Sequence, residues 1–245
     1  LCLETYVTDI KSAEMIKYAS NAFLATKISF INEISNICEK VGANVLDVAK
    51  GMGMDKRIGA SFLNAGIGYG GSCFPKDTKA LVQIAGNVAH DFRLLKAVIE
   101  VNNKQQLLLI EKAKKVMNMS KKRIAVLGAS FKPNTDDIRE ASSLIIIEAL
   151  LNIGAEIVLY DPKAIQYVKN IFGDAIQYSR CIDESIRDAS AVFIVTEWED
   201  IQTYPLEKYV QLMREPILFD GRNCYTDEDV KKQKIDYYSV GRKSI

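Results

Sequence analysis

The hydrophobic pattern of this chain changes character near residue 119, and this change constrains the fold more than any other feature. From residue 9 to about 41, and again from 91 to about 117, apolar residues recur at helical spacing, which predicts two long amphipathic helices. Beyond residue 119, short apolar runs alternate with helical segments, and the first run covers residues 123–127. Such alternation predicts a parallel sheet covered by helices.

The two patterns divide the chain into a helical part and an α/β part. Residues 1–118 are expected to form an all-helical domain whose long helices suit a dimer interface, and residues 119–245 a doubly wound, Rossmann-like parallel-sheet domain. Two shorter helices are expected at 44–50 and 78–85, ended by the glycines at 51, 53 and 86. Further helices are expected at 142–153, 164–171, 182–188 and 206–213, and strands at 156–160, 191–196, 217–220 and 237–240.

A glycine-rich loop that contains a cysteine is the strongest candidate site. Residues 66–77 read Gly-Ile-Gly-Tyr-Gly-Gly-Ser-Cys-Phe-Pro-Lys-Asp. So many glycines indicate a backbone that passes close to a neighbour, and its N–H groups would form an anion cradle. Cys73 would lie beside them, near Lys76 and a helix expected to start at Asp77 or Thr78, and both neighbours favour the nucleophilic thiolate. Asp77 would orient water or cap that helix. The alternative is a turn with a buried structural cysteine.

Two pairs of polar residues complete the candidate chemistry. Lys17 and Asn21 lie four positions apart in the first long helix, which puts an ammonium and an amide on one face, although a solvated face gives the same spacing. Lys132 and Arg222 each follow an expected strand of the α/β part. Ligands of doubly wound sheets bind beyond the carboxyl ends of strands, so this pair suits the phosphates of a nucleotide. Two exposed charges are the alternative.

Composition excludes several classes of function. A net charge of +1 and a pI near 7.7 give no electrostatic case for nucleic acid or an anionic membrane. Cysteines at positions 2, 38, 73, 181 and 224 form no CxxC pair, which favours reduced thiols in a cytoplasm over disulfides or a zinc site. A single histidine leaves little room for histidine catalysis or metal binding. No apolar run is long enough to cross a bilayer, and the start Leu-Cys-Leu, without methionine, reads as the interior of a longer protein.

The loop and its surroundings resemble the UDP-glucose/GDP-mannose dehydrogenase family. Residues 68–77 resemble the family's catalytic cysteine loop, residues 13–27 its central helix, and the motifs Phe131-Lys132 and Asp220-Gly221-Arg222-Asn223 its nucleotide-sugar domain. The likeness covers residues 9–245 but includes no counterpart of the family's N-terminal dinucleotide-binding domain. Glycines 66, 68 and 71 match the letters of a dinucleotide fingerprint without a preceding strand, so that match carries no weight. The resemblance therefore implies a fragment that is inactive alone.

The resemblance also implies a reaction and roles for individual residues. UDP-glucose would be oxidised to UDP-glucuronate with two NAD, and Cys73 would add to an aldehyde intermediate and form a thioester. Lys17 would stabilise the oxyanion, while Asn21 and Asp77 would position water. In a homodimer, Arg57 would reach the neighbouring subunit's substrate. The expected substrate contacts are Phe62, Gly68, Tyr69, Gly70, Phe131, Lys132 and Arg222, and the expected cofactor contacts are Lys76 and Arg139.

Three other readings stay open at this point. A related enzyme of the GDP-mannose type is the nearest, although the cysteine run favours the UDP-glucose branch. A nucleotide-sugar-binding and dimerisation module without redox activity is the second. A cysteine hydrolase is less favoured, because His90 has no visible link to Cys73.

Overall fold

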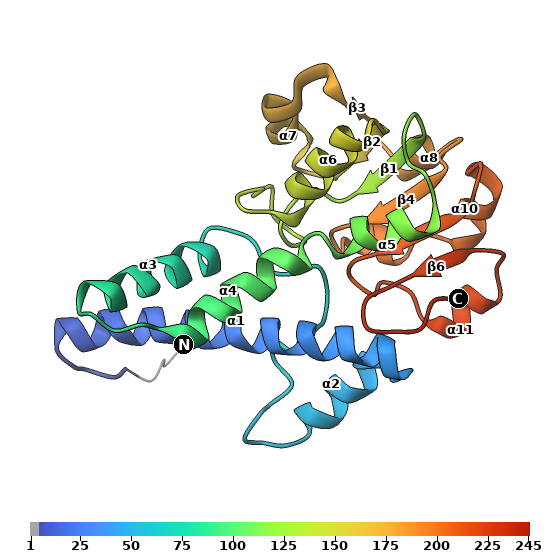
Figure 1. The fold of residues 1–245 in the computed structure, drawn as a ribbon. Coiled ribbons are helices and arrows are strands. Elements are labelled where there is room, and N and C mark those ends of the chain that lie inside the picture. The colour runs from blue at the N-terminus through green and yellow to red at the C-terminus, as the bar shows by residue number, and fades with distance from the viewer. Residues whose placement is uncertain (1–4) are drawn as a thin grey trace.

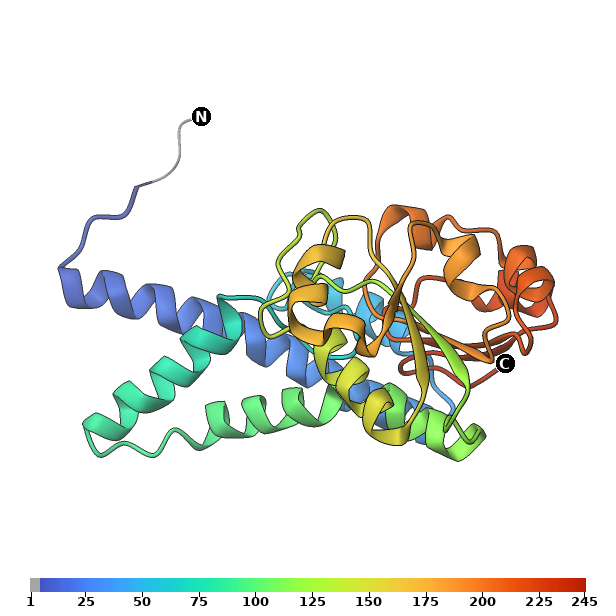
Figure 2. The same cartoon turned by 90° about the horizontal axis from the view of Figure 1, so that it is seen from above.

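A helical layer and a six-stranded α/β unit make up the computed structural model, which describes residues 5–245 (Figure 1). Cys2, expected to be a reduced thiol, lies outside the described residues. Figure 2 shows that α3 and α4 form a V that lies against α1, the longest helix. The helices of this layer and the one that follows it are α1 (Ile10–Val41), α2 (Val45–Gly53), α3 (Phe74–Asn87), α4 (Arg93–Gln105) and α5 (Leu108–Val116).

Helix α1 confirms the first predicted helix almost to the residue. The carboxylate of Asp9 accepts a hydrogen bond from Ser12 N (3.0 Å) and so caps the N-terminus. At the other end Gly42 adopts a left-handed φ of 78°, and its N–H bonds to Cys38 O. Within residues 5–245, no helix has both the length and the apolarity needed to span a bilayer.

The predicted bounds of α2 and α3 were wrong at three places. Helix α2 runs on to Gly53, so Gly51 lies inside the helix and only Gly53 stands at its end. Helix α3 begins at Phe74, not at Asp77 or Thr78, and it continues past Gly86 to Asn87. Its early start has a physical reason: Pro75 lies in the first turn, where the N–H that proline lacks would have no intrahelical partner.

The second long helix predicted at 91–117 is two helices, α4 and α5, separated at Gln106 and Leu107. Gln105 and Gln106 are both buried at this break, and the amide of Gln105 bonds to the glycine loop instead of facing solvent. After the break α5 turns onto the sheet, where Leu109 and Ile110 join its core. Burial of this apolar face outweighs the propensity for one continuous helix.

The α/β unit is a parallel sheet in the order β3-β2-β1-β4-β5-β6, which confirms the predicted doubly wound architecture. Successive strand residues point to opposite faces of the sheet. Ile124 belongs to the core under α5, α6 and α7, whereas Ala125 belongs to the core under α8–α11. The short elements β3, η1, α9 and α11 were not predicted. The bounds are β1 (Arg123–Leu127), α6 (Ser142–Ile153), β2 (Glu156–Tyr160), α7 (Ile165–Phe172), η1 (Gly173–Ala175), β3 (Gln177–Tyr178), α8 (Ile182–Ile186), β4 (Ala191–Ile194), α9 (Glu199–Gln202), α10 (Leu206–Leu212), β5 (Ile217–Asp220), α11 (Asp227–Lys231) and β6 (Asp236–Tyr238).

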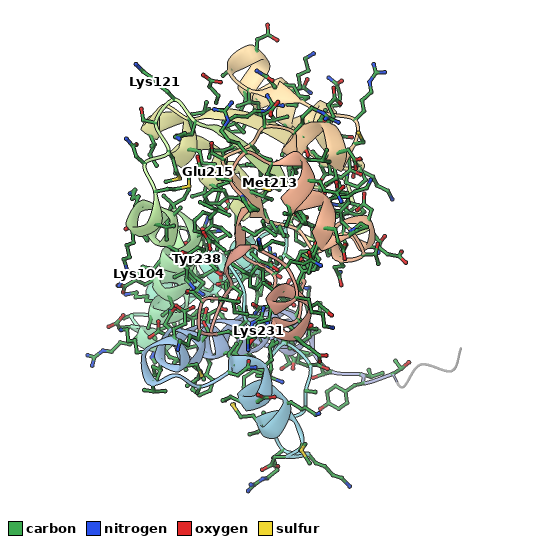
Figure 3. All side chains as sticks on the ribbon, turned by 90° about the vertical axis from the view of Figure 1, so that its right-hand side faces the viewer. Lys104, Lys121, Met213, Glu215, Lys231 and Tyr238 are labelled. Carbon is green, nitrogen blue, oxygen red and sulfur yellow. The ribbon has the colours of Figure 1, made fainter. Side chains whose placement is uncertain are left out.

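The end of the chain returns to the helical layer. Figure 3 shows Tyr238 of β6 and Lys231 of α11 on the side of the α/β unit nearest the helices. Beyond β6, Gly241 bonds to the backbone of Val45 at the start of α2 (2.9 Å). The last residues of the sequence thus pack beside the first helices.

Candidate functional site

Three buried side-chain amides hold the glycine loop, and sequence reasoning missed all three. Asn32 accepts a hydrogen bond from Gly66 N (2.9 Å), and Gln105 donates one to Gly66 O (2.8 Å). Asn102 accepts from Tyr69 N (2.8 Å) and donates to Tyr69 O (3.2 Å). The available signal was an amide on an otherwise apolar face of a predicted helix. These bonds satisfy backbone groups of a loop that has no sheet or helix partners of its own.

The glycine loop packs closely between α4 on one side and residues 131–140 on the other. Gly68 has a φ of 84°, and a Cβ there would lie 2.7 Å from Asn102 Oδ1. Gly71 has a φ of 82°, and a Cβ there would meet the ring of Phe131 at 2.8 Å. Gly71 N also donates to Arg139 O (2.8 Å). Glycine is therefore required at both positions, for conformation and for space.

Cys73 stands at the N-terminal end of α3 with its side chain exposed. Its carbonyl accepts the first bond of the helix, from Asp77 N (2.8 Å), so the two residues lie one turn apart. A helix N-terminus carries partial positive charge, and this favours a negative group at the position of the thiol. The geometry makes Cys73 an accessible thiol rather than a core residue.

A cation, an amide and a carboxylate converge one turn beyond this thiol. Asn21 Nδ2 donates to Asp77 Oδ2 (2.5 Å), and Lys17 Nζ lies 3.4 Å from the same oxygen. Asp77 is only 8% exposed, whereas Lys17 reaches solvent. The structure therefore brings together Lys17, Asn21 and Asp77, which sequence reasoning had placed on two separate helices.

A cavity of about 350 Å³ lies between the helical layer and the α/β unit, beside the glycine loop. Seven residues expected to contact a substrate line it together. Sequence reasoning missed five further lining side chains, which are Ile28, Asn32, Asn64, Phe74 and Glu197. The expected residues found here are Phe62, Gly68, Tyr69, Gly70, Phe131, Lys132 and Arg222.

Arg222 is held firmly on one wall of this cavity. Its Nε donates to Val195 O (2.7 Å) and lies 3.2 Å from Glu197 Oε2, and its Nη1 contacts Gly68 O at 3.4 Å. The carboxylate of Asp220 accepts from Arg222 N (2.8 Å) and fixes the turn. Burial raises the pKa of Asp220 above its ordinary value.

The other walls are aromatic and cationic. Phe74 packs edge-on against both Phe62 and Tyr69, with ring centroids 6.0 and 5.8 Å apart. Burial raises the pKa of Tyr69 to about 12, so its phenol stays neutral. Lys132 Nζ lies 5.3 Å from the centroid of the Phe131 ring. The cavity is thus lined by the aromatic rings of Phe62, Tyr69 and Phe74 and by two cationic side chains, Lys132 and Arg222.

Three predicted residues lie outside this arrangement in the chain. Arg57 is exposed, and its guanidinium pairs with Asp55 (2.6 Å). Arg139 is exposed and pairs with Asp137 (2.7 Å). Lys76 is exposed on the first turn of α3.

The crevice of the sheet itself is filled by the chain's own carboxylate. Asp161, just after β2, is 2% exposed. Its Oδ2 accepts from Ala129 N (2.7 Å), Ser130 N (3.1 Å) and Trp198 Nε1 (3.0 Å). In doubly wound sheets these loop N–H groups bind the pyrophosphate of a dinucleotide. The residues of this crevice therefore do not fit a dinucleotide.

Comparison with known proteins shows two family models along the chain. Residues 11–104 match the central domain of the UDP-glucose/GDP-mannose dehydrogenase family, and residues 125–227 match the UDP binding domain of the same family. The UDP-glucose 6-dehydrogenase YwqF of Bacillus subtilis is 60% identical over 241 residues, which cover 98% of this chain and 55% of that protein.

Solved structures agree with this match. A UDP-glucose dehydrogenase from Pyrobaculum islandicum superposes with a TM-score of 0.85 at 33% identity, over 94% of this chain and 51% of that one. A UDP-D-ManNAc dehydrogenase from Pyrococcus horikoshii gives a TM-score of 0.82 at 26% identity, over 97% and 53% of the two chains. The chain spans about half the length of the relatives that it matches.

Proposed function

Since the chain belongs to the UDP-glucose/GDP-mannose dehydrogenase family, we propose that it is the part of a UDP-glucose 6-dehydrogenase that binds the nucleotide sugar and supplies the nucleophile. One observation carries the proposal: an exposed thiol at a helix N-terminus stands one turn from the cluster of Lys17, Asn21 and Asp77. The same loop that ends at this thiol lines the cavity that contains Arg222.

The cavity matches the chemistry of a uridine diphosphate sugar. Its aromatic wall, Phe62 and Phe74, offers apolar faces for a base. Arg222 offers a planar fork and Lys132 a point charge, and together they balance a diphosphate. The sugar would extend along the glycine loop toward Cys73.

The residues around the thiol suit acyl transfer. The Cys73 thiolate adds to the carbon of a substrate aldehyde, an S–C bond forms, and the carbonyl electron pair moves to oxygen. The Lys17 ammonium balances that oxyanion. At the later thioester stage, Asn21 and Asp77 orient a water molecule for attack; the C–S bond breaks and the thiolate returns. Because this chemistry requires a free thiol, we place it in the cytoplasm.

The redox cofactor is proposed to be NAD, which when bound would accept the hydrides released by the substrate. Because Asp161 fills the crevice of this chain's own sheet, a domain outside these 245 residues would hold the dinucleotide. Lys76 follows Cys73 by three positions on α3, the carbonyl of Arg139 accepts from Gly71 N (2.8 Å), and both residues are exposed. These two cations would face the cofactor's phosphates.

A homodimer is also part of the proposal. Helix α1 carries an exposed apolar stripe of residues spaced seven apart, Ile16, Phe23, Phe30 and Ile37, which are 49–65% exposed. Such a stripe on a long helix suits packing against the same helix of a second copy. In this arrangement Arg57 would reach the partner's cavity, which accounts for its position away from the cavity of its own chain.

Calorimetric titration of the 245-residue chain with UDP-glucose and with GDP-mannose tests the nucleotide-sugar assignment. UDP-glucose is expected to bind, and Arg222→Ala to weaken it about tenfold or more, because a charged hydrogen-bond donor to the phosphates is lost. Arg214→Ala, an exposed arginine outside the cavity, is the matched control. Preference for GDP-mannose would overturn the UDP-glucose assignment, and failure of a folded chain to bind either sugar would overturn the cavity's role.

The thiol step is tested without any cofactor by adding the 6-aldehyde of UDP-glucose, ¹³C-labelled at the carbonyl. A hemithioacetal signal is expected for the native chain and for Cys181→Ser, since Cys181 is the other exposed cysteine within residues 5–245. The signal should vanish in Cys73→Ser. An adduct that persists in Cys73→Ser would show that Cys73 is not the nucleophile.

A further inference from the structure

We propose that residues 239–242, here called the C-terminal strap, fix the position of Arg222, and that Arg242 and Asn223 are positioning residues for diphosphate binding. The inference rests on the proposed function of the cavity. It concerns residues that lie outside the cavity lining and reach the ligand only through Arg222.

The strap is anchored first to the helical layer. Gly241 N donates to Glu39 Oε1 on α1 (2.7 Å), and Val45 N of α2 donates to Gly241 O (2.9 Å). Lys112 of α5 bonds to Glu39 (2.6 Å) and to Ser239 O. Gly241 has a φ of 73°, and a Cβ at this position would overlap the side chain of Val45. Contacts from α1, α2 and α5 therefore hold two of the four strap residues, Ser239 and Gly241.

The strap is anchored second to the turn that carries Arg222. Asn223 donates to Val240 O (3.1 Å) and accepts from Val240 N (3.2 Å), so its amide pairs with the strap as another backbone would. The same amide contacts Ala65 O, at the start of the glycine loop, at 3.4 Å. Asn223 adopts a φ of 55°, a conformation that its side-chain bonds help to hold.

Arg242 closes the connection from the far side of the turn. Although it is arginine, it is only 3% exposed. Its Nη2 donates to Asn223 Oδ1 (3.2 Å), Tyr225 O (3.1 Å) and Tyr237 Oη (3.0 Å). Its Nη1 also donates to Asp227 Oδ1 (2.7 Å), and this ion pair offsets part of the cost of burying the guanidinium. Two of the acceptors of Nη2, on Asn223 and Tyr225, lie just after Arg222 in the chain, and the third is on Tyr237 of β6.

A continuous path of hydrogen bonds then leads from Arg242 to Arg222. Tyr237 Oη, which accepts from Arg242, donates to Asp220 Oδ2 (2.6 Å), and Asp220 Oδ1 accepts from Arg222 N (2.8 Å). Arg222 Nε is thereby set against Val195 O at 2.7 Å. Two walls of the cavity, Arg222 and the glycine loop, are thus tied to one strap.

Two variants separate positioning from folding. Asn223→Gly removes the amide bonds but tolerates the positive φ, so the backbone of the turn is retained. Arg242→Lys keeps the charge and loses the fork that reaches several acceptors. Lys243→Gln, exposed and next to the strap, is the matched control. Both test variants are expected to unfold cooperatively and to bind UDP about five- to twentyfold more weakly, as expected for the loss of one or two hydrogen bonds.

The decisive readout does not require a ligand. In ¹⁵N NMR spectra the Nε–H of Arg222, bonded to Val195 O, should exchange slowly in the native chain and in Lys243→Gln. Exchange is expected to accelerate about tenfold or more in both test variants. Unchanged exchange in folded Asn223→Gly and Arg242→Lys would overturn the strap's role. If Arg222→Ala binds UDP as well as the native chain, the proposed function fails. The exchange measurement still tests whether the strap fixes the position of Arg222.

Discussion

At the scale of single residues, the glycine loop has little room for a side chain. Gly68 combines a positive φ with a close approach to Asn102, whereas Gly86 lies in the helix α3, where an added Cβ would meet nothing within 4 Å. The two glycines differ in environment although they are only eighteen positions apart.

Opposite effects of alanine are therefore expected at these positions. Gly68→Ala should lower the free energy of unfolding by about 3 kcal/mol, through strain and the displacement of Asn102. Gly86→Ala should raise it by about 0.5–1 kcal/mol, because alanine loses less entropy in a helix. Urea unfolding of both variants measures the difference. Equal stability of the two variants would contradict the account of the loop.

The residues that we propose to carry the chemistry could be named from the sequence, and the buried amides that hold the glycine loop could not. Cys73, Asp77 and Arg222 stood out because thiols, charges and glycines are rare in combination. Asn32 and Asn102 did not, since an amide in a helix reads as a solvated residue until its backbone partner across the fold is known. Supporting residues depend on tertiary contacts that periodicity does not encode.

At the scale of elements, an ion pair ties α8 to α10. Asp183 accepts hydrogen bonds from Lys208 (2.9 Å) and from Tyr204 (2.9 Å). The bond from Lys208, followed by the bond from Tyr204, lowers the pKa of Asp183 below its ordinary value of 3.8. Because the folded state favours the charged carboxylate, this pair stabilises the fold above pH 3.8 and ceases to do so as the pH falls through the lowered pKa.

Asp183→Asn tests this pH dependence. At pH 7 the variant should be less stable by about 0.5 kcal/mol, since the pair is partly exposed and screened by solvent. The deficit should persist down to about pH 4 and disappear below it, in urea unfolding at several pH values. Asp236→Asn, exposed in β6, should show no such change. A deficit that grows in acid would contradict the sign of the pKa shift.

Elements with a strong period were predicted well, and their ends less well. The strands β1, β2 and β5 and the helix α6 have the predicted bounds, because apolar runs flanked by turn residues define them. The division between α4 and α5 was missed, since the apolar repeat continues through it. It exists because α5 packs on the sheet while α4 packs on α1, and this difference arises only from the tertiary fold.

At the scale of the whole molecule, the exposed stripe of α1 predicts self-association. Phe23→Asp places a charge in the centre of the stripe and should raise the dimer dissociation constant about a hundredfold or more. The reason is that both copies lose a ring that the dimer would bury. Sedimentation velocity over a dilution series measures the change. Lys11→Asp introduces the same side chain on α1 outside the stripe and should leave the dimer intact. A native chain that stays monomeric would overturn the proposed dimer.

The filled crevice of the sheet predicts how the chain responds to a dinucleotide. Because Asp161 already accepts from the loop N–H groups, the 245-residue chain should show no saturable NADH binding in a fluorescence titration. Circular dichroism of the same sample confirms that the chain is folded. Saturable binding in the micromolar range would show that the crevice admits a dinucleotide and would contradict this account.

The change of hydrophobic pattern predicted the order of the helical part and the α/β part along the chain. It did not predict how the two parts pack against each other. Periodicity describes each element alone, whereas the cavity and the strap are contacts between residues far apart in sequence. Resemblance placed Phe131 and Arg222 near a common ligand, and it gave no indication that the tail would reach α1 and α2.

The strap also has a consequence for how the protein is made. Gly241 bonds to Glu39 across 202 positions of sequence, and Val45 of α2 bonds to the same glycine. During synthesis from the N-terminus, α1 and α2 emerge long before their partner in the tail exists. Helices α1 and α2 therefore lack this part of their packing until the strap, which follows Glu39 by 202 positions, has been synthesised.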